Sequence, residues 1–358
     1  MKMVFLLLLS GSLLIWLLMR IHYPAYPSSP QFDAASGRFA NTPPTRPLDH
    51  MATAAALWAM MTDGRRFMPP QPLPSETVDW AYFLAASPDK ARLVWFGHSS
   101  VMLRMGGQTV FIDPVFADSV SPLPWMMRRF QAPPAALQDV PPPDVVVYSH
   151  SHYDHLDKRA ARHFAANGRT RFIVPLGMGA LLRSWGVAAE RIEEADWWQT
   201  LLSGSLRLTA VPARHNSGRG GGDRDRSLWT GWVLESGGEK IYYSGDSSYG
   251  THFAEIGRRF GGLDLALVEN GQYNTAWPDN HMFPEQTAQA VRDVGAARFM
   301  PVHWGAYALS THAWDEPVRR SLPLAEAVGV VLLTPKLGQV VERDSVTTRW
   351  WQENISMQ

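Results

Sequence analysis

The stretch VVVYSHSHYDHLD at residues 145–157 places three histidines and an aspartate within six residues, directly after a β-branched run typical of a buried strand. A spacing of two lets His150 and His152 approach the same metal ion if the chain stays extended. Asp154 and His155 follow where the chain turns into a predicted helix, so they can reach a second ion nearby. A polar loop with local hydrogen bonds is the alternative, but its imidazoles would repel one another as pH falls.

Three further candidates stand where other predicted strands end. They are His215, Asp246 and His303, after the runs at 206–211, 240–244 and 298–302. Each alone is more often structural, but together with residues 150–155 they complete a set of ligands for two metal ions. The chain has no cysteine, so imidazole and carboxylate groups are the available ligands, which favours zinc, iron or manganese.

The remaining pattern predicts an α/β fold, because short β-rich runs alternate with turns and helical stretches. The predicted strands are 92–96, 109–112, 145–149, 171–174, 206–211, 229–234, 240–244, 265–269, 298–302 and 330–334, and the predicted helices are 156–166, 177–185, 251–260, 284–294 and 315–328. Residues 23–90 are rich in proline, with one apolar helical candidate at 51–61. We interpret them as an extension packed over a catalytic domain at 91–345, which is followed by a tail at 346–358.

Composition and charge narrow the class of protein. The 358 residues are 46% apolar and 18% charged, which suits one large core. Lys plus Arg and Asp plus Glu both number 33, so there is no basic field to hold nucleic acid. The absence of cysteine excludes disulfide bonds, thiolate metal sites and a cysteine nucleophile.

Residues 1–22 form a predicted membrane anchor. The stretch from Met3 to Met19 carries no charge and lies between Lys2 and Arg20. A cleaved signal peptide is the alternative, but no small-residue cleavage pattern follows. The flanking charges place the N-terminus in the cytoplasm, so we expect an inner-membrane protein whose catalytic domain lies outside the cytoplasm.

The H-x-H-x-D-H motif at 150–155, with His215, Asp246 and His303, resembles the metallo-β-lactamase superfamily over about residues 91–345. Four segments are similar to the branch that contains RomA-like proteins and N-acyl-phosphatidylethanolamine-hydrolysing phospholipase D. These are WFGHSSVMLRMGGQTVFIDPVF at 95–116, SPLPW at 121–125, RHNSGRGGGDRDRSLW at 214–229 and HWGAY at 303–307.

The resemblance implies a four-layer αβ/βα sandwich with two zinc ions at a strand-end edge, although other divalent metals can substitute. It assigns His150, His152 and His215 to one zinc, Asp154, His155 and His303 to the other, and Asp246 as the bridging carboxylate. It also places His281 near substrate, whereas a structural residue at the helix start before Pro284 is the alternative. Asp246, His281 and Asp154 are therefore the predicted catalytic residues.

Two residues outside the ligand set stand in similar loops. Asp113 follows a predicted strand, and we expect it to orient a ligand imidazole or to brace a loop through hydrogen bonds. His98 is open between a structural and a functional role. The run Gly220-Gly221-Gly222 departs from the family pattern and predicts a more mobile loop over the site.

The predicted chemistry is hydrolysis by a metal-bound hydroxide. Two zinc ions lower the pKa of bound water to about 7, so no serine or cysteine nucleophile is needed. We expect a phosphodiesterase of phospholipase D type acting on N-acylated phosphatidylethanolamine-like lipids. A lipid substrate is favoured by the anchor, by the branch resemblance and by the segment LPWMMRR at 123–129, whose arginines suit a phosphate headgroup.

Three alternatives stay open at this point. One is a lactonase or another carboxylic-ester hydrolase that uses the same dinuclear site. A second is a diiron oxidoreductase, although that group usually has Glu where His152 stands and carries a flavin domain. A third is a membrane-tethered scaffold with a structural metal. The expected partners are a phospholipid or small ester substrate and, through the N-terminal segment, a membrane.

Overall fold

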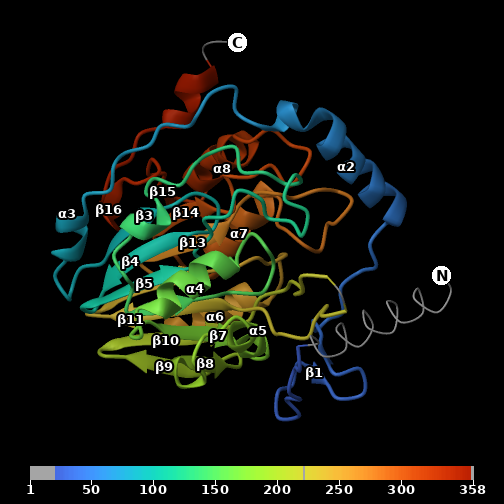
Figure 1. Cartoon of the computed structure of the whole chain (residues 1–358). Helices are drawn as coiled ribbons and strands as arrows, with labels where there is room; N and C mark the ends of the chain where they lie inside the picture. The colour runs from blue at the N-terminus through green and yellow to red at the C-terminus, as the bar shows by residue number, and fades with distance from the viewer. Residues whose placement is uncertain (1–20, 221, 356–358) are drawn as a thin grey trace, which may run out of the picture.

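The computed structural model describes residues 21–220 and 222–355 of the chain (Figure 1). The predicted anchor at 1–22 therefore lies almost wholly outside the described residues. Within the described part of the chain, no helix has both the length and the apolar character needed to cross a membrane.

The described residues form two seven-stranded mixed sheets and a small two-stranded sheet. The neighbouring strands of the first large sheet are β16 (Val340–Glu342), β3 (Arg92–Trp95), β4 (Val101–Met105), β5 (Gln108–Ile112), β6 (Val145–Val147), β7 (Arg171–Pro175) and β8 (Ile192–Ala195). Those of the second are β15 (Val331–Leu332), β14 (Arg298–Val302), β13 (Leu265–Glu269), β12 (Glu239–Tyr243), β11 (Gly231–Ser236), β10 (Leu206–Val211) and β9 (Thr200–Ser203). Strands β5 to β8 and β12 to β15 are parallel, so their carboxyl ends meet at one edge of each sheet.

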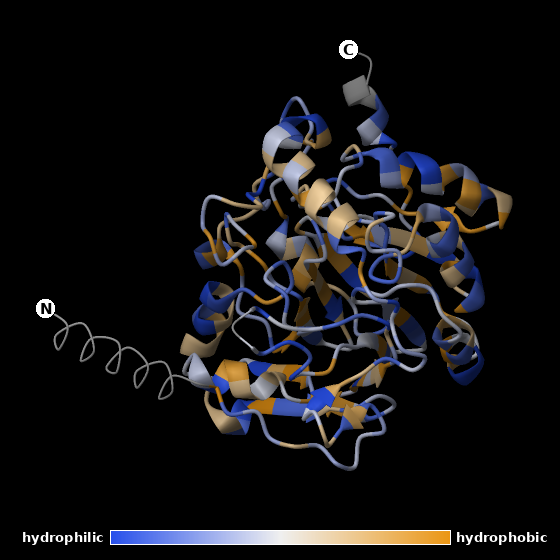
Figure 2. Ribbon diagram, turned by 90° about the vertical axis from the view of Figure 1, so that its right-hand side faces the viewer, coloured by the Kyte–Doolittle hydropathy of each residue, from blue (hydrophilic) through white to orange (hydrophobic). Residues whose placement is uncertain are grey.

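Helices cover the outer face of each large sheet. Helices α4 (Lys158–Ala166) and α5 (Met178–Ser184) pack on the first sheet, and α6 (His252–Phe260), α7 (Pro284–Asp293) and α8 (Glu316–Ala327) pack on the second (Figure 1). Strand alternation explains the layers: Leu93 and Trp95 face the core between the sheets, while Val94 and Phe96 face the helices. Figure 2 shows the hydrophobic colour concentrated on the inner strands. The predicted αβ/βα sandwich is confirmed.

Most predicted elements of the two large sheets are present with small shifts of their ends, but four strands of these sheets were missed, three of them at sheet edges. Strands β8, β9 and β16 are short and carry charged or exposed side chains, so they lack the apolar run that marks a central strand. Strand β4 is rich in methionine rather than in β-branched residues. These strands pair because neighbouring strands provide hydrogen-bonding partners, which sequence pattern alone does not reveal.

The proline-rich extension has secondary structure of its own. It contains β1 (Phe32–Asp33), β2 (Arg38–Phe39), α2 (His50–Asp63) and α3 (Trp80–Leu84). The extension also contains the short 3₁₀ helix η1 (Gly64–Phe67). Three more 3₁₀ helices lie outside it, namely η2 (Leu137–Asp139), η3 (Ala189–Arg191) and η4 (Trp350–Ile355). The helical candidate at 51–61 is confirmed by α2, whose first amides donate to the side chain of Asp49.

The described part of the C-terminal tail, residues 346–355, contributes to the core between the sheets. Trp350 and Trp351 are buried there. The ring of Trp350 stacks 5.4 Å from that of Trp304, which in turn stacks 5.3 Å from Trp95. Trp350 also donates its indole N–H to Thr334 O at 3.1 Å, so its polar atom is satisfied. The segment therefore completes the core.

We expect Trp350→Ala to lower the free energy of unfolding by about 3–5 kcal/mol, because it removes a large buried ring and leaves a cavity. Urea denaturation followed by circular dichroism measures this change. Val346→Ala is the matched control, since Val346 in the same segment is 94% exposed, and it should change stability by less than about 0.5 kcal/mol. Equal effects of the two substitutions would contradict a core role for the segment.

Candidate metal centre

The predicted ligand residues converge at the carboxyl ends of four strands. The H-x-H-x-D-H loop follows β6, and α4 then begins with Asp157 as its N-cap. His215, Asp246 and His303 follow β10, β12 and β14, as the sequence pattern requires. The structure brings all of these side chains into one cluster, whereas their roles as ligands remain a prediction.

Three imidazoles form the first half of the cluster. His150 Nε2 lies 2.9 Å from His152 Nδ1, and His215 Nε2 lies 3.2 Å from the same His152 atom. One ring nitrogen from each residue falls within a sphere small enough for a single metal ion. This group is the set that the resemblance assigned to one zinc.

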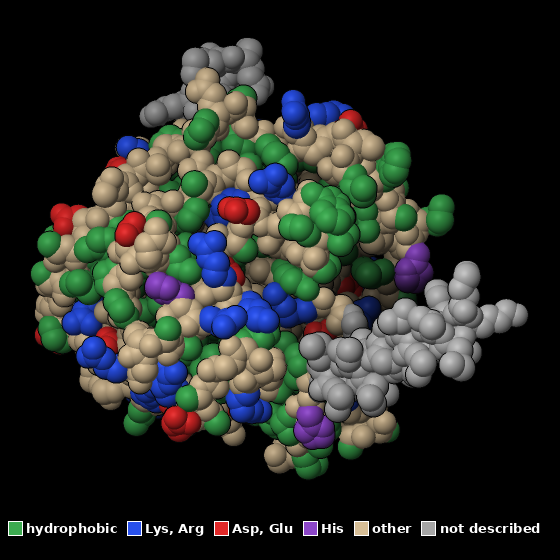
Figure 3. All heavy atoms as spheres, viewed as in Figure 1, with side chains coloured by type: hydrophobic (Ala, Val, Ile, Leu, Met, Phe, Trp, Pro, Cys, Tyr) green, Lys and Arg blue, Asp and Glu red, His purple; other side chains and the backbone are tan. Residues whose placement is uncertain are grey.

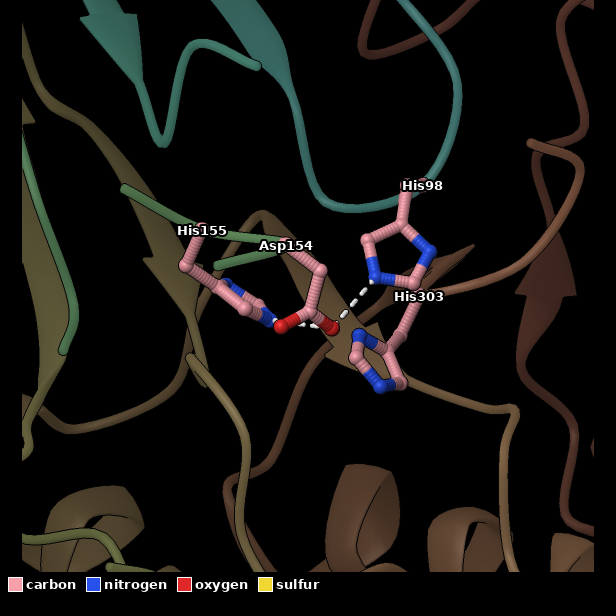
Figure 4. Close-up of side chains that lie close together, drawn as sticks. All are labelled: His98, Asp154, His155 and His303. Carbon is pink, nitrogen blue, oxygen red and sulfur yellow. Dashed lines mark hydrogen bonds and ion pairs between the residues drawn. The ribbon is translucent and has the colours of Figure 1, made fainter. Parts of the chain in front are cut away.

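The second half contains Asp154, His155 and His303, together with His98 (Figure 4). His155 Nε2 lies 3.6 Å from Asp154 Oδ2. His98 Nε2 lies 2.9 Å from the same oxygen, and its ring is 4.2 Å from that of His303. The role of His98 was open in the sequence, and the structure places it in contact with a predicted ligand.

Asp246 lies between the two halves. Its Oδ2 is 3.1 Å from His155 Nε2, and its Oδ1 is 3.2 Å from His303 Nδ1. The same Oδ2 is 3.6 Å from His215 Nε2 and 3.7 Å from His150 Nε2. A carboxylate in contact range of both groups has the placement that a bridging ligand needs.

Asp113 forms hydrogen bonds with the ligand loop that follows β6, as expected from its own position after a strand. Its Oδ2 is 2.7 Å from His155 Nδ1 and accepts from the Tyr243 hydroxyl at 2.6 Å. Its Oδ1 accepts from the backbone N–H of Ser149 at 2.7 Å. The expected contact with an imidazole is confirmed, and it orients the Nε2 atom of His155 toward the cluster.

His281 and Glu269 form a buried pair beside the cluster. His281 Nδ1 lies 2.7 Å from Glu269 Oε2, while Glu269 Oε1 accepts from Met282 N at 2.7 Å. The His281 ring is 4.8 Å from that of His303 and 5.2 Å from that of His215. Sequence reasoning missed Glu269, although a carboxylate that ends the apolar run LALVE was a usable signal.

The electrostatics suit a divalent cation. Burial lowers the pKa of His150, His215 and His303 well below the usual range and that of His152 to about 4. These imidazoles are therefore neutral at pH 7 and can offer lone pairs to a metal. Among the described residues, Asp246 Oδ1 has no hydrogen-bond partner. Buried neutral imidazoles around an unsatisfied carboxylate oxygen are a donor set that fits zinc or a similar ion.

A cavity of about 780 Å³ opens onto the cluster. It is lined by five of the predicted ligands, by His281 and by residues 39–41 and 44–48 of the extension. Asn41 Nδ2 donates to His215 O at 2.6 Å, and Arg46 Nη2 pairs with Asp279 Oδ1 at 2.6 Å. The extension is thus fastened as one wall of the cavity.

Arg219 anchors the glycine-rich loop to the metal-ligand loop. Its Nη1 donates to Leu156 O at 2.6 Å and to Ser151 O at 3.2 Å. Its guanidinium group lies 3.7 Å from the ring centroid of Tyr153. Sequence reasoning also missed this residue, because an arginine among glycines gave no sign of its buried partners.

Arg128 and Arg129, which the sequence predicted to suit a phosphate headgroup, lie in different environments. Arg129 Nη2 donates to Val115 O at 2.8 Å and its Nε donates to Ala117 O at 3.2 Å. Its guanidinium group lies 4.4 Å from the ring centroid of Tyr307. The expectation is wrong for Arg129, because its donors are used inside the fold, whereas Arg128 is exposed.

Comparison with known proteins gives consistent relatives. The model of a family described as a β-lactamase superfamily domain matches residues 108–304. An uncharacterised protein of Mycobacterium tuberculosis is 38% identical over 365 residues, covering 94% of this chain and 95% of the relative. N-acyl-phosphatidylethanolamine-hydrolysing phospholipase D 1 of Caenorhabditis elegans is 31% identical over 229 residues, covering 61% of this chain and 64% of that protein.

A solved structure of a metallo hydrolase from the archaeon Ignicoccus hospitalis shares the fold, with a TM-score of 0.56 and 19% identity. The match covers 71% of this chain and 98% of the archaeal chain.

We expect the metal-free protein to lose stability as pH falls from about 6.5 toward about 4. Burial lowers the pKa of both His98 and His152 to about 4. Between these pH values the two histidines therefore bind protons in the unfolded chain but stay neutral in the folded chain. Each such histidine costs roughly 1.4 kcal/mol per pH unit in that window. Burial also opposes protonation of His155, but Asp246 and Asp154 outweigh it and raise the pKa of His155, which offsets part of this loss.

Urea midpoints of the metal-free protein at about pH 7 and about pH 5 measure the effect. The His152→Gln variant is the control, and its stability should fall less steeply with pH. Stability that is unchanged or higher at the lower pH would contradict the prediction.

Proposed function

Because the chain belongs to the metallo-β-lactamase superfamily, we propose that this metal-dependent hydrolase is a zinc phosphodiesterase of phospholipase D type. Its proposed substrates are N-acylated phosphatidylethanolamine-like lipids, from which it releases phosphatidic acid. The observation that carries the proposal is the position of Asp246 between two groups of ligand side chains at the floor of a large cavity. The similarity to the Caenorhabditis elegans phospholipase supports the choice of bond and substrate.

Divalent cations held by the two groups would polarise a phosphoryl oxygen and lower the pKa of a coordinated water molecule. The chain supplies the proton acceptor. Burial raises the pKa of Asp246 to about 6 in the metal-free protein, and the position of its carboxylate between the two groups would let it take a proton from water held there. Its contacts with His155 and His303 hold that carboxylate in a fixed orientation.

His281 and Glu269 can supply the proton that the leaving group needs. Burial raises the pKa of Glu269 and lowers that of His281, which favours a proton on Glu269 Oε2 that is donated to His281 Nδ1. The neutral imidazole then carries its own proton on Nε2. That proton can pass to the leaving alkoxide while the Glu269 proton moves to Nδ1.

The cavity wall combines polar and apolar groups in a way that suits an amphiphile. Leu48, Leu57, Val120, Met127 and Leu309 line it above the polar floor. Apolar walls with a few convergent polar groups are typical of sites that bind ligands with both kinds of surface. A phospholipid offers a charged phosphodiester for the floor and methylene groups for the walls.

Hydrolysis of N-acyl-phosphatidylethanolamine in ¹⁸O-labelled water tests the function. The full-length, zinc-loaded protein should place the label in phosphatidic acid, because water oxygen bonds to phosphorus while the bond from phosphorus to the ethanolamine oxygen breaks. The released N-acylethanolamine takes up a proton and stays unlabelled. Asp246→Asn is the negative control, and its product should fall below detection. Ring opening of lactones or release of fatty acid without phosphatidic acid would instead identify a carboxylic-ester hydrolase.

We expect His281→Ala to slow turnover about 100-fold, because the substitution removes a proton donor. Zinc content should stay at the wild-type level, because the substitution removes no predicted metal ligand. Steady-state kinetics and metal analysis of the same preparation measure both quantities. Glu269→Gln should also slow turnover, since it keeps the shape of the side chain but cannot pass on a proton. Loss of zinc from His281→Ala would make this residue a metal ligand.

A further inference from the structure

Helix α2, from His50 to Asp63, is an apolar helix with almost no partner inside the described chain. Its sequence HMATAAALWAMMTD distributes methionine, leucine, tryptophan and alanine around every side. Ala56 is its one buried residue. A helix that is apolar all round is normally covered by protein or lipid, so the exposure of α2 indicates a missing partner.

The exposed side chains of α2 continue onto a neighbouring loop. Met51 is 81% exposed and Trp58 is 66% exposed on the helix, while Trp125 of the loop is 69% exposed. Figure 2 views the molecule from the side of α2, and Figure 3 shows hydrophobic side chains gathered at the same place. We call this surface the apolar ridge; it comprises Leu48, Met51, Leu57, Trp58, Met61, Leu123 and Trp125.

A groove of about 740 Å³ runs between the helix and the loop. Seven methionine and aromatic residues line it, namely Met60, Met61, Phe67, Met68, Trp125, Met126 and Met127. Arg65, Arg66 and Arg128 line it as well and are exposed. Asp63 is the one acidic residue among those that line the groove, so apolar side chains lie beside a net positive charge, which matches acyl chains below anionic headgroups.

The ridge lies beside the mouth of the candidate active site. Leu57 and Met127 line both this groove and the cavity above the metal cluster. Among the first described residues, Ile21 and Tyr23 pack against the core between the first sheet and helices α4 and α5. The uncharged stretch 3–19 comes before this point in the sequence and lies outside the described residues.

We propose that the apolar ridge and its three arginines dock onto the surface of an anionic lipid bilayer, with Trp58 and Trp125 inserted at the level of the headgroups. Tryptophan prefers that depth, and arginine is attracted to anionic lipid. A second copy of this chain is the competing occupant.

The docking surface stands independently of the proposed function, because it makes no assumption about the bond that is cleaved. It also differs from the predicted anchor, because every residue of the ridge lies between Leu48 and Trp125. Docking would hold the mouth of the cavity at the bilayer surface, where a substrate with its head in the cavity could keep its tails in lipid.

A single fluorescent label tests the proposal, because the chain contains no cysteine that could compete for it. The full-length Ala55→Cys protein places an environment-sensitive fluorophore on exposed α2 and leaves both tryptophans intact. We expect nitroxide-bearing phosphatidylglycerol vesicles to quench this label strongly. The control is Leu202→Cys on β9, which is 56% exposed and outside the ridge, and its label should be quenched much less.

Two sets of variants separate the contributions. Trp58→Glu combined with Trp125→Glu should reduce quenching of the label at position 55 to the level seen at position 202, whereas Leu202→Glu should leave it unchanged. Replacing Arg65 and Arg66 by alanine should weaken the docking equilibrium about fivefold per arginine on phosphatidylglycerol and little on phosphatidylcholine.

Three outcomes would overturn the proposal. One is equal quenching at positions 55 and 202, and another is quenching at position 55 that survives the two glutamate substitutions. The third is a label response that rises with protein concentration without vesicles, which would assign the ridge to a second copy. All these measurements use metal-free protein without substrate, so their failure would leave the hydrolysis experiment unaffected.

Discussion

The cluster of buried imidazoles and carboxylates around Asp246 is the constraint on which the rest of the structure depends. Removing so many titratable groups from water is unfavourable unless each is paired, hydrogen-bonded or bound to a cation. The protein meets part of this cost with contacts behind the ligands, of which the Asp113 contacts with His155 and Tyr243 are the clearest. Among the described residues, His155 Nε2 and Asp246 Oδ1 have no hydrogen-bond partner, and a cation bound in the cluster would give each of them a partner.

This constraint explains why the ligands come from four strand ends on two sheets. Ligand residues that all lie on one flexible loop would change their distances to one another when the loop moves. Ligand residues on loops held by two packed sheets keep these distances fixed. The backbone contacts between the loops show this directly, since His303 N donates to His98 O at 3.0 Å and His98 N donates to Trp304 O at 2.7 Å. Trp304 then stacks in the tryptophan cluster, so the core between the sheets continues into the floor of the site.

The sequence was informative wherever a residue's role depends on its place along a strand. The ligand loop after β6 and the ends of β10, β12 and β14 were found because strand direction decides which edge a residue reaches. Glu269 and Arg219 were missed because their partners lie far along the chain, and Arg129 was misread because an exposed arginine and one bonded to buried carbonyls look alike in sequence. Pattern gives the direction of a side chain, whereas its partners depend on how distant loops pack.

The metal cluster and the cavity wall are under different constraints. Residues matched by the family cover 108–304, which includes every predicted ligand, whereas the wall segment at 39–48 and helix α2 lie outside that range. The cluster must keep its ligands within bonding distance of a cation, so few side chains can replace them. The wall is held by replaceable contacts such as Arg46 with Asp279, and its apolar groups need only fill space. Substrate choice can therefore change through the extension while the chemistry at its floor stays the same.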